Sequence, residues 1–564
     1  MTDRSALMCS VVAVTAASLT SSTVAMSETV WTYSVQAAVN ASYFDPVTRK
    51  LYKARTAGAT PTSISFDAAS DTVTWNTHGR ANSDVFAFAV SGGGTAPTPL
   101  SPSTPYPLIN AATNTFQLSL TRDGDPINFA TSGSPTITGY INSAFDNPAA
   151  WQDRGPPNRW KMFDQSNQTA TTAVGSIQVV VAPSSRVDTV AALALAGVSE
   201  IYFASSGTSA SRTNNLLQSC TFDDAAWTKT NASVTANAVR APDGTMTADK
   251  LVGSATNGVH TISQTSGGQL KSVYVRAGEL TKGTFATAGG SGWFDLGDGT
   301  ITLNSGTGSF FIERVNNSLW WRIWTPTPAS GFTIGLRNAA GADSFAGSAS
   351  QGFYIWGAQS EAVTADSRPT GPIVTTGSAV TTSTDTHIEI YDLTDTAFSD
   401  YQFAGIYSPA TYRRDMATST IPPWASQSIT VTLVGPGTVE CGNLIFALSR
   451  DIGAAEYASS VGTRNFSKGI DPDDFGNVDP VIRGFSKSGR WNCALKERRS
   501  DAIKNLFDLN RATPNLFLMA PDNEAETGMQ WKERGIIYGL AKSWDFTFFQ
   551  PKDDKYVLQC EGYA

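Results

Sequence analysis

The sequence predicts a mainly β, multi-domain protein built from β-sandwich or jelly-roll modules, with a smaller α+β unit at its C-terminal end. Three observations support this prediction. Charged residues make up only 16% of the 564 residues, whereas a typical soluble domain has about 25%. Serine and threonine recur at alternate positions over long tracts, which is typical of strands with one polar face. At roughly 100–200 residues per domain, the length corresponds to about three to five domains.

The composition argues against several classes of function. A net charge of −8 provides no basic surface of the kind that binds nucleic acid. The five cysteines are odd in number and widely spaced, so we expect free thiols in a reducing cytosol rather than disulfides or a zinc site. No apolar run reaches the roughly 18 residues that a membrane-spanning helix needs.

The N-terminal residues 1–30 are expected to form an ordered or packed arm. A mildly apolar run over 6–14 follows Arg4 and is similar to the apolar stretch of a secretory signal. Asp3 precedes Arg4, however, and serine and threonine dilute the run. These two features favour an arm that stays with the protein.

Residues 31–60 and 139–165 are expected to form one small module rich in aromatic residues. Its members Trp31, Tyr43 and Tyr52 resemble the aromatic set of small chitin-binding modules. The intervening residues 61–138 read as an inserted small β module.

Alternating apolar residues carry the prediction for this inserted module. The alternation runs over 71–75 and 84–90, and further strands are predicted at 115–120 and 127–129. A proline-rich connection separates the two pairs of strands.

Residues 166–208 and 372–465 are expected to form one β-sandwich scaffold. Their apolar runs, at 177–182, 190–195 and 428–434, are suited to core strands. The block 209–371 reads as an insertion between two scaffold strands. Because insertions succeed where the chain ends lie close together, we expect the strands that flank this block to belong to one folded layer.

Residues 466–564 are predicted to form the α+β unit, because charged residues become much denser there. The apolar positions of 498–510 follow helical spacing, and Thr513-Pro514 ends this helix. Strands are predicted around it, at 515–519, 535–538, 544–549 and 555–560.

The run 151–164 supports a family resemblance. It reads W-x-D-x-G-x-x-N-R-W-x-M-F-D and resembles a motif of tailed-bacteriophage and prophage tail proteins. Further stretches resemble the C-terminal half of that family: 451–453, 457–462, 466–468, 474–477 and 511–514. The resemblance implies a virion structural protein of the baseplate or tail tip, assembled in the host cytoplasm. It also implies contacts with other tail proteins and a symmetric homo-oligomer, a trimer or a hexamer.

Block 209–371 resembles the carbohydrate-binding jelly-roll modules carried by phages. The matching stretches are 215–217, 222–229, 241–245, 248–251, 272–275 and 356–359. This second resemblance implies recognition of a host surface polysaccharide. Block 61–138 resembles a small β module of phage structural proteins.

Aromatic residues are the candidates for glycan binding, since a flat ring stacks on a sugar face. In a strand over 319–324, Trp320, Arg322 and Trp324 share one face, which we expect to be turned outward, and Trp293 beside Gly292 is a further candidate. The alternative is that these rings belong to the core. Trp151, Arg159 and Trp160 are predicted instead to fix one module onto the next, with the guanidinium stacked between the indoles.

The sequence does not favour catalysis or a cofactor. The histidines His78, His260 and His387 are isolated, and no Gly-x-Ser-x-Gly elbow occurs. Asp295 and Asp298 are a pair of carboxylates that could cleave a glycan, but turn formation beside glycine explains them better. The acidic stretch 471–482 has the glycine of a calcium loop, but Phe475 and Ile482 stand where the loop needs oxygen ligands, so an acidic turn explains it better. The alternatives to an adhesive tail protein are a glycan-degrading tail enzyme and a structural component without a ligand.

Overall fold

The computed structural model is mainly β, as the sequence predicts. The residues that it describes are 5–133, 136–166, 168–316, 318–362, 368–393, 414–456, 458–467, 481, 484–496, 499–519, 535–548 and 553–563. They form two compact units: one contains 1–24 and 165–564, and the other contains 25–164. Each unit is described by itself.

The unit 25–164 begins with a small sheet and its aromatic core. The sheet has the order β12-β5-β4-β3. Its strands are β3 (Thr29–Val30), β4 (Ser42–Asp45), β5 (Lys50–Ala54) and β12 (Trp151–Asp153). Segments 31–60 and 139–165 therefore come together, because β12 pairs with β5. The 3-10 helix η1 (Asn158–Phe163) follows.

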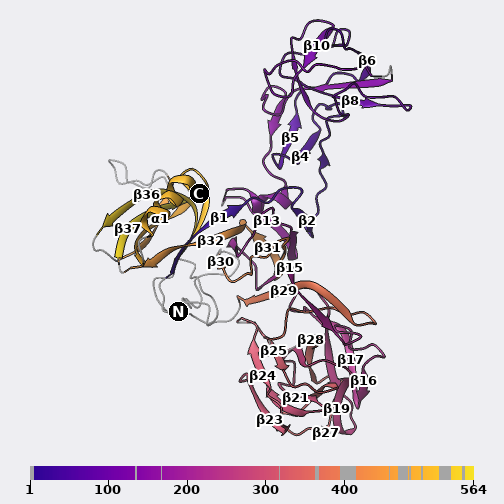
Figure 1. Cartoon of the computed structure of the whole chain (residues 1–564), viewed down its shortest axis with the longest axis vertical. Coiled ribbons are helices and arrows are strands. Elements are labelled where there is room, and N and C mark those ends of the chain that lie inside the picture. Colours follow the sequence, from indigo (N-terminus) through magenta and orange to yellow (C-terminus); the bar gives the residue numbers. More distant parts are fainter. Residues whose placement is uncertain are drawn as a thin grey trace. The chain divides into compact units, whose positions relative to one another are not determined.

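The same unit contains a closed barrel of short strands (Figure 1). In the order β10-β7-β6-β11-β8-β9, these are β10 (Thr115–Leu118), β7 (Thr72–Thr74), β6 (Thr62–Asp67), β11 (Ile137–Asn142), β8 (Val85–Val90) and β9 (Tyr106–Ile109). Phe66, Phe86 and Phe116 fill its interior. The prediction of a strand at 127–129 is wrong, because these residues do not form one. Phe129 is buried, but its backbone N–H donates to the side chain of Asp71 and makes no strand pairing.

One sheet of the larger unit has nine strands and joins both ends of the chain (Figure 1). In spatial order they are β30 (Arg414–Thr418), β14 (Thr189–Leu195), β32 (Asn443–Ala455), β1 (Ser5–Val12), β35 (Asn515–Met519), β36 (Ile536–Phe548), β37 (Asp553–Gly562), β34 (Phe485–Lys496) and β33 (Ser460–Asn465). The helix α1 (Ser500–Asn510) buries Ile503 and Phe507 against one face of it.

The first strand of the N-terminal arm, β1, is an interior strand of this sheet. β1 pairs with β32 on one side and with β35 on the other. Its side chains alternate between two cores: Ala6 and Met8 pack on the side of α1, whereas Cys9 packs on the opposite side. Because both faces are covered, apolar residues occupy neighbouring positions of β1 as well as alternate ones, with Ser10 as an interruption. Scaffold strands and C-terminal strands thus form one sheet.

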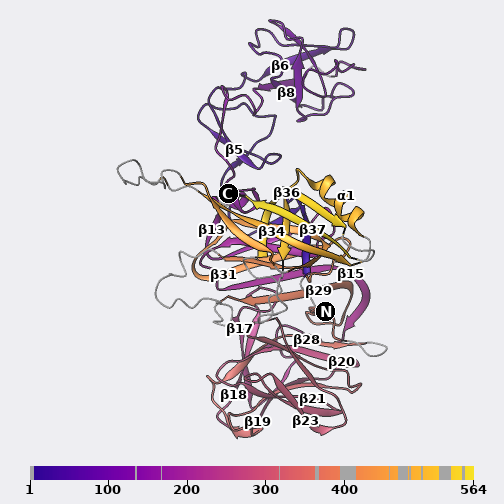
Figure 2. The ribbon, with the colours of Figure 1, turned by 90° about the vertical axis from the view of Figure 1, so that its left-hand side faces the viewer.

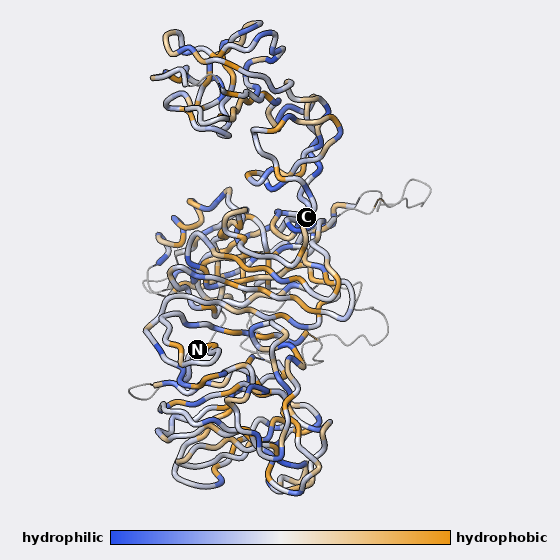
Figure 3. The backbone as a smooth tube through the Cα atoms, turned by 90° about the vertical axis from the view of Figure 1, so that its right-hand side faces the viewer, coloured by the Kyte–Doolittle hydropathy of each residue, from blue (hydrophilic) through white to orange (hydrophobic). Residues whose placement is uncertain are grey.

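The second sheet of this unit has eleven strands. Its main path is β2 (Leu19–Ser22), β13 (Thr171–Val181), β31 (Ser428–Cys441), β15 (Glu200–Asn214), β28 (Gly352–Glu361), β20 (Leu270–Arg276), β25 (Trp320–Thr325) and β24 (Phe311–Arg314). Three further strands attach to it: β17 (Ala232–Val239), β18 (Ala248–Gly253) and β29 (Val380–Asp392). Hydrophobic and hydrophilic residues alternate along many of the strands (Figure 3).

A seven-stranded sheet completes the inserted module. Its strands are β16 (Thr228–Thr230), β19 (Asn257–Gln264), β26 (Phe332–Leu336), β21 (Lys282–Thr287), β22 (Gly290–Asp295), β23 (Thr300–Gly306) and β27 (Ser344–Ala346). It packs face to face on β28, β20 and β25 around Ile262, Val273, Phe285, Ile323 and Phe353. The module is therefore a two-sheet β sandwich.

The strands that flank the inserted module are direct neighbours, as the sequence predicts (Figure 2). β15 leads into the module and β29 leads out of it. They pair antiparallel from Glu200–Asp392 to Asn214–Val380. The module thus occupies the position of a hairpin loop between two scaffold strands.

Candidate functional site

The outer face of the seven-stranded sheet carries a row of small polar residues. Gly335 pairs with Thr261 on one side and with Thr284 on the other, and Thr284 pairs in turn with Trp293. Their sequence neighbours, such as Ile334, point into the core of the module. This alternation turns the hydroxyl groups away from the core.

A cleft of about 560 Å³ lies over this face. Its polar lining consists of side chains with hydroxyl groups and the carboxylate of Asp343; the hydroxyl residues are Thr261, Thr284, Thr287, Ser291, Ser305 and Thr333. Hydroxyl groups both donate and accept hydrogen bonds. The cleft therefore offers the mixed donors and acceptors that match the hydroxyl groups of a sugar.

Asp343 is held in place by two neighbours. Its Oδ1 accepts a hydrogen bond from Thr284 Oγ1 at 2.8 Å and lies 3.0 Å from Arg337 Nε. Arg337 also donates to the carbonyl oxygen of Gly341. The Asp343 side chain is 37% exposed, whereas that of Arg337 is only 10% exposed, so the carboxylate is the part of this ion pair that solvent reaches.

Trp293 lies on the outer face, one strand from the cleft residue Thr284. Its ring is half-buried, and the guanidinium carbon of Arg337 lies 3.6 Å from the ring centroid. One face of the indole is therefore occupied by a cation–π contact. In this position Trp293 supports Arg337, which in turn holds Asp343.

The prediction that Trp320, Arg322 and Trp324 face outward is wrong. They are 1%, 7% and 9% exposed. Trp320 packs with Trp356 of the module and with Tyr202 of the scaffold strand β15. The physical reason is that side chains from other strands of the same sheet pack on this face, such as Tyr202 on Trp320 and Phe311 on Trp324, which sequence alternation alone does not reveal.

Arg322 helps to hold the segment around Pro369, which connects the module to β29. Its guanidinium lies 4.9 Å from the ring centroid of Tyr274 and donates to the carbonyl oxygens of Pro369, at 3.1 Å, and Thr370. Thr370 Oγ1 also donates to Glu361 at 2.8 Å. Arg322 is thus a structural residue of the junction.

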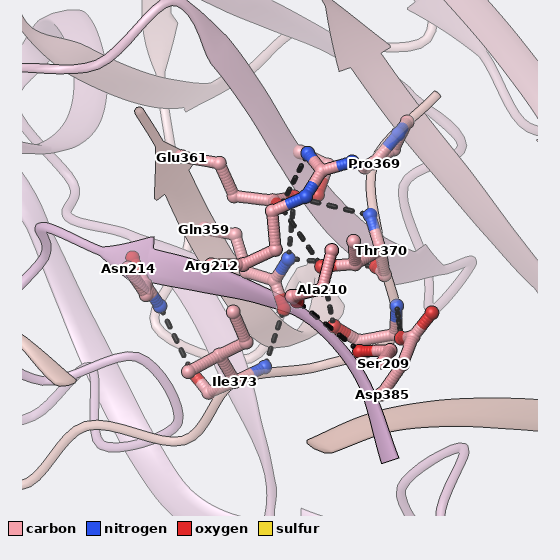
Figure 4. Close-up of polar contacts among 12 residues, drawn as sticks. Ser209, Ala210, Arg212, Asn214, Gln359, Glu361, Pro369, Thr370, Ile373 and Asp385 are labelled. Atoms are coloured by element: carbon pink, nitrogen blue, oxygen red, sulfur yellow. Dashed lines mark hydrogen bonds and ion pairs between the residues drawn. The ribbon is translucent and has the colours of Figure 1, made fainter. Parts of the chain in front are cut away.

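A buried polar cluster surrounds this junction (Figure 4). Glu361 is fully buried and lies 3.7 Å from Arg212. Asn214 Nδ2 donates to the carbonyl oxygen of Ile373 at 2.9 Å, and Gln359 Oε1 accepts from the backbone N–H of Ile373. These bonds join the segment that enters the module, at Asn214, to the segment that leaves it, at Ile373.

Asp295 and Asp298 make turn contacts between β22 and β23. Asp295 Oδ1 accepts from the backbone N–H of Gly297 at 2.9 Å, and its carboxylate pairs with Lys282. Asp298 accepts from the backbone N–H and the hydroxyl group of Thr300. Burial raises the pKa of Asp295, but the hydrogen bonds from Lys282 and Gly297 outweigh burial and lower it below its usual value. Both residues thus have the turn contacts that the sequence favours.

The three histidines lie in separate places. His78 is buried beside Phe116, and His260 is buried with both ring nitrogens near backbone carbonyl oxygens. His387 Nε2 lies 2.8 Å from Glu389. Burial raises the pKa of Glu389, but the contact with His387 and hydrogen bonds from threonines outweigh burial and lower it.

The predicted interface residues of the unit 25–164 lie inside its aromatic module. Trp151 is 3% exposed and packs edge to face on Trp31, with ring centroids 5.4 Å apart. Trp160, on η1 with Arg159, stacks on Phe44 at 5.9 Å. The two indoles therefore pack on different rings.

Within the described ranges, no group of three or more histidine, cysteine or acidic side chains could hold a metal ion. The described helices include none that is both long and apolar enough to cross a membrane. No protein-family model matches the chain, and no curated protein matches it.

Proposed function

We propose that the chain is a structural and adhesive protein of a phage tail, in which module 209–371 binds a host surface glycan. The cleft on the outer face of the seven-stranded sheet carries this proposal. Its lining combines small apolar residues with hydroxyl groups and one carboxylate, and these polar groups recognise sugar hydroxyls by hydrogen bonding. The opposite sheet of the module is continuous with the scaffold strands and shares core residues with them, which leaves the outer face of the seven-stranded sheet for attachment.

The assembly role rests on the resemblance of 151–164 to phage tail proteins. In this proposal the scaffold contacts other tail or baseplate proteins in a trimer or a hexamer, and the protein resides in the virion tail. Separating attachment from assembly suits an inserted module, because the module can vary while the scaffold strands remain paired.

Filling the cleft tests the attachment role. Ala286 lines the cleft and lies on the outer face of β21. The variant Ala286→Trp is expected to abolish binding of the full chain to host polysaccharide, because the indole would occupy the space of the ligand. Binding is measured by surface plasmon resonance on a panel of immobilised polysaccharides.

The matched control is Thr235→Trp, at an exposed position of β17 outside the cleft. It is expected to bind as the original chain does. Equal binding by both variants would contradict the proposal. Release of reducing sugar by the original chain would instead favour the glycan-degrading enzyme, and absence of binding to every polysaccharide would favour a structural component.

A further inference from the structure

We infer that the cleft selects uncharged glycans and that Asp343 is the residue that accepts a hydrogen bond from a sugar hydroxyl. The inference rests on the proposed function and names the ligand class of the same site. It follows from the two oxygens of Asp343 and from the charges around the cleft.

The two oxygens of Asp343 have different surroundings. Both contacts, with Thr284 and with Arg337, use Oδ1. Among the described residues, Oδ2 has no hydrogen-bond partner. The contacts of Oδ1 with Thr284 and Arg337 thus fix the carboxylate before a ligand binds. Oδ2 stays available at the wall of the cleft. Such preorganisation reduces the entropy cost of binding.

The charges on this sheet face occur in opposite pairs. Arg337 pairs with Asp343, and Lys282 pairs with Asp295 in a neighbouring row. The cleft lining contains neither lysine nor arginine among the described residues. The fully buried ring of His260 directs its nitrogens at backbone carbonyl oxygens.

An acidic glycan is disfavoured by this arrangement. A uronate or phosphate group would meet the exposed oxygen of Asp343, whose partner Arg337 is already engaged and 10% exposed, and juxtaposed like charges oppose binding. A neutral sugar instead donates a hydroxyl proton to Oδ2 and exchanges further hydrogen bonds with Thr261, Thr284 and Thr333. The ligand class that fits is an uncharged, hydroxyl-rich polysaccharide.

The test compares neutral polysaccharides (dextran, mannan and galactan) with acidic ones (alginate, polygalacturonate and hyaluronan) of similar chain length. The full chain is expected to bind at least one neutral polysaccharide and none of the acidic ones at about 0.15 M salt. Asp343→Asn is expected to weaken neutral binding about tenfold or more, since a hydrogen bond to a charged group is lost. Asp298→Asn, the same chemical change in a turn outside the cleft, is the control and should leave binding unchanged.

Two results separate this inference from the proposed function. Binding of acidic polysaccharides at equal or higher affinity, or unchanged neutral binding by Asp343→Asn, would overturn the inference and leave glycan attachment standing. Absence of binding to all six polysaccharides would overturn both.

Discussion

Lys271 and Arg322 are buried cations of the inserted module with different surroundings. Lys271 is 0% exposed, and its Nζ donates only to the backbone carbonyl oxygens of Gly268 and Ala329 among the described residues. Arg322 also bonds carbonyl oxygens but adds a contact with the ring of Tyr274. Burial without a carboxylate partner lowers the pKa of Lys271 to about 8.

This lowered pKa predicts a pH dependence of stability. Between about pH 8 and pH 10.5, the unfolded chain holds the Lys271 proton more strongly than the folded chain does, so stability rises with pH by up to about 1.4 kcal/mol per pH unit. The cost of burying the charge is fully present below pH 8. Lys271→Met removes this contribution, so the melting temperature of the original chain should rise relative to that of the variant between pH 8 and pH 10. A difference that stays constant with pH would contradict the role of this group.

At the residue scale, the sequence predicts some of the local structure around the candidate site. Trp293 lies on an outer face beside the cleft, and the turn roles of Asp295 and Asp298 follow from the neighbouring glycines. The burial of Trp320 could not be predicted, because strand alternation separates two faces without showing what covers each. Asp343 was missed because its partners Thr284 and Arg337 are brought together only by strand pairing and a loop.

At the scale of elements, β1 is a strand that the sequence indicates only weakly, although it pairs with a neighbour on each side. Its apolar run is short and interrupted by serine, which suggests an arm and does not identify a partner. Pairing with β32 and β35 supplies backbone hydrogen bonds on both sides. The best local signal behaves differently: the helix predicted at 498–510 is α1 (Ser500–Asn510), because its spacing of apolar residues is set within the segment itself.

The central place of β1 predicts a large effect from one small substitution. Met8 is 0% exposed in the core beneath α1, so Met8→Ala should reduce the free energy of opening of the surrounding strands by about 2–5 kcal/mol. Native-state hydrogen exchange of the β1 and β35 amides measures this change. Val174→Ala, at a side chain that is 87% exposed, is the control and should change stability by less than about 0.5 kcal/mol. Equal effects of the two substitutions would show that β1 is not a stable part of the sheet.

At the scale of the molecule, two large segments are each inserted between two strands that pair with one another. The segment 25–164 lies in the sequence between β2 and β13, and the module lies between β15 and β29. The sequence predicts the second insertion because the apolar runs on both sides of it suit the strands of one sandwich scaffold. It does not predict that scaffold and C-terminal strands share one sheet, since that continuity depends on long-range pairings, those of β1 with β32 and β35 and those of β34 with β32 and β33.

The most direct measurement removes the module. Replacing 215–379 by Asn-Gly joins Asn214 to Val380, which are already paired, through a two-residue hairpin turn. Tyr202 and Ile390, which the module covers, are changed to threonine in the same chain to limit aggregation. The shortened chain is then compared with the full chain for polysaccharide binding and for protection of the β1 amides.

We expect the shortened chain to keep the β1 amides protected and to lose all polysaccharide binding. Binding equal to that of the full chain would contradict the assignment of attachment to the module. Loss of β1 protection would show that the scaffold sheet depends on the module. It would therefore contradict the view that the module is a separable insertion between two scaffold strands.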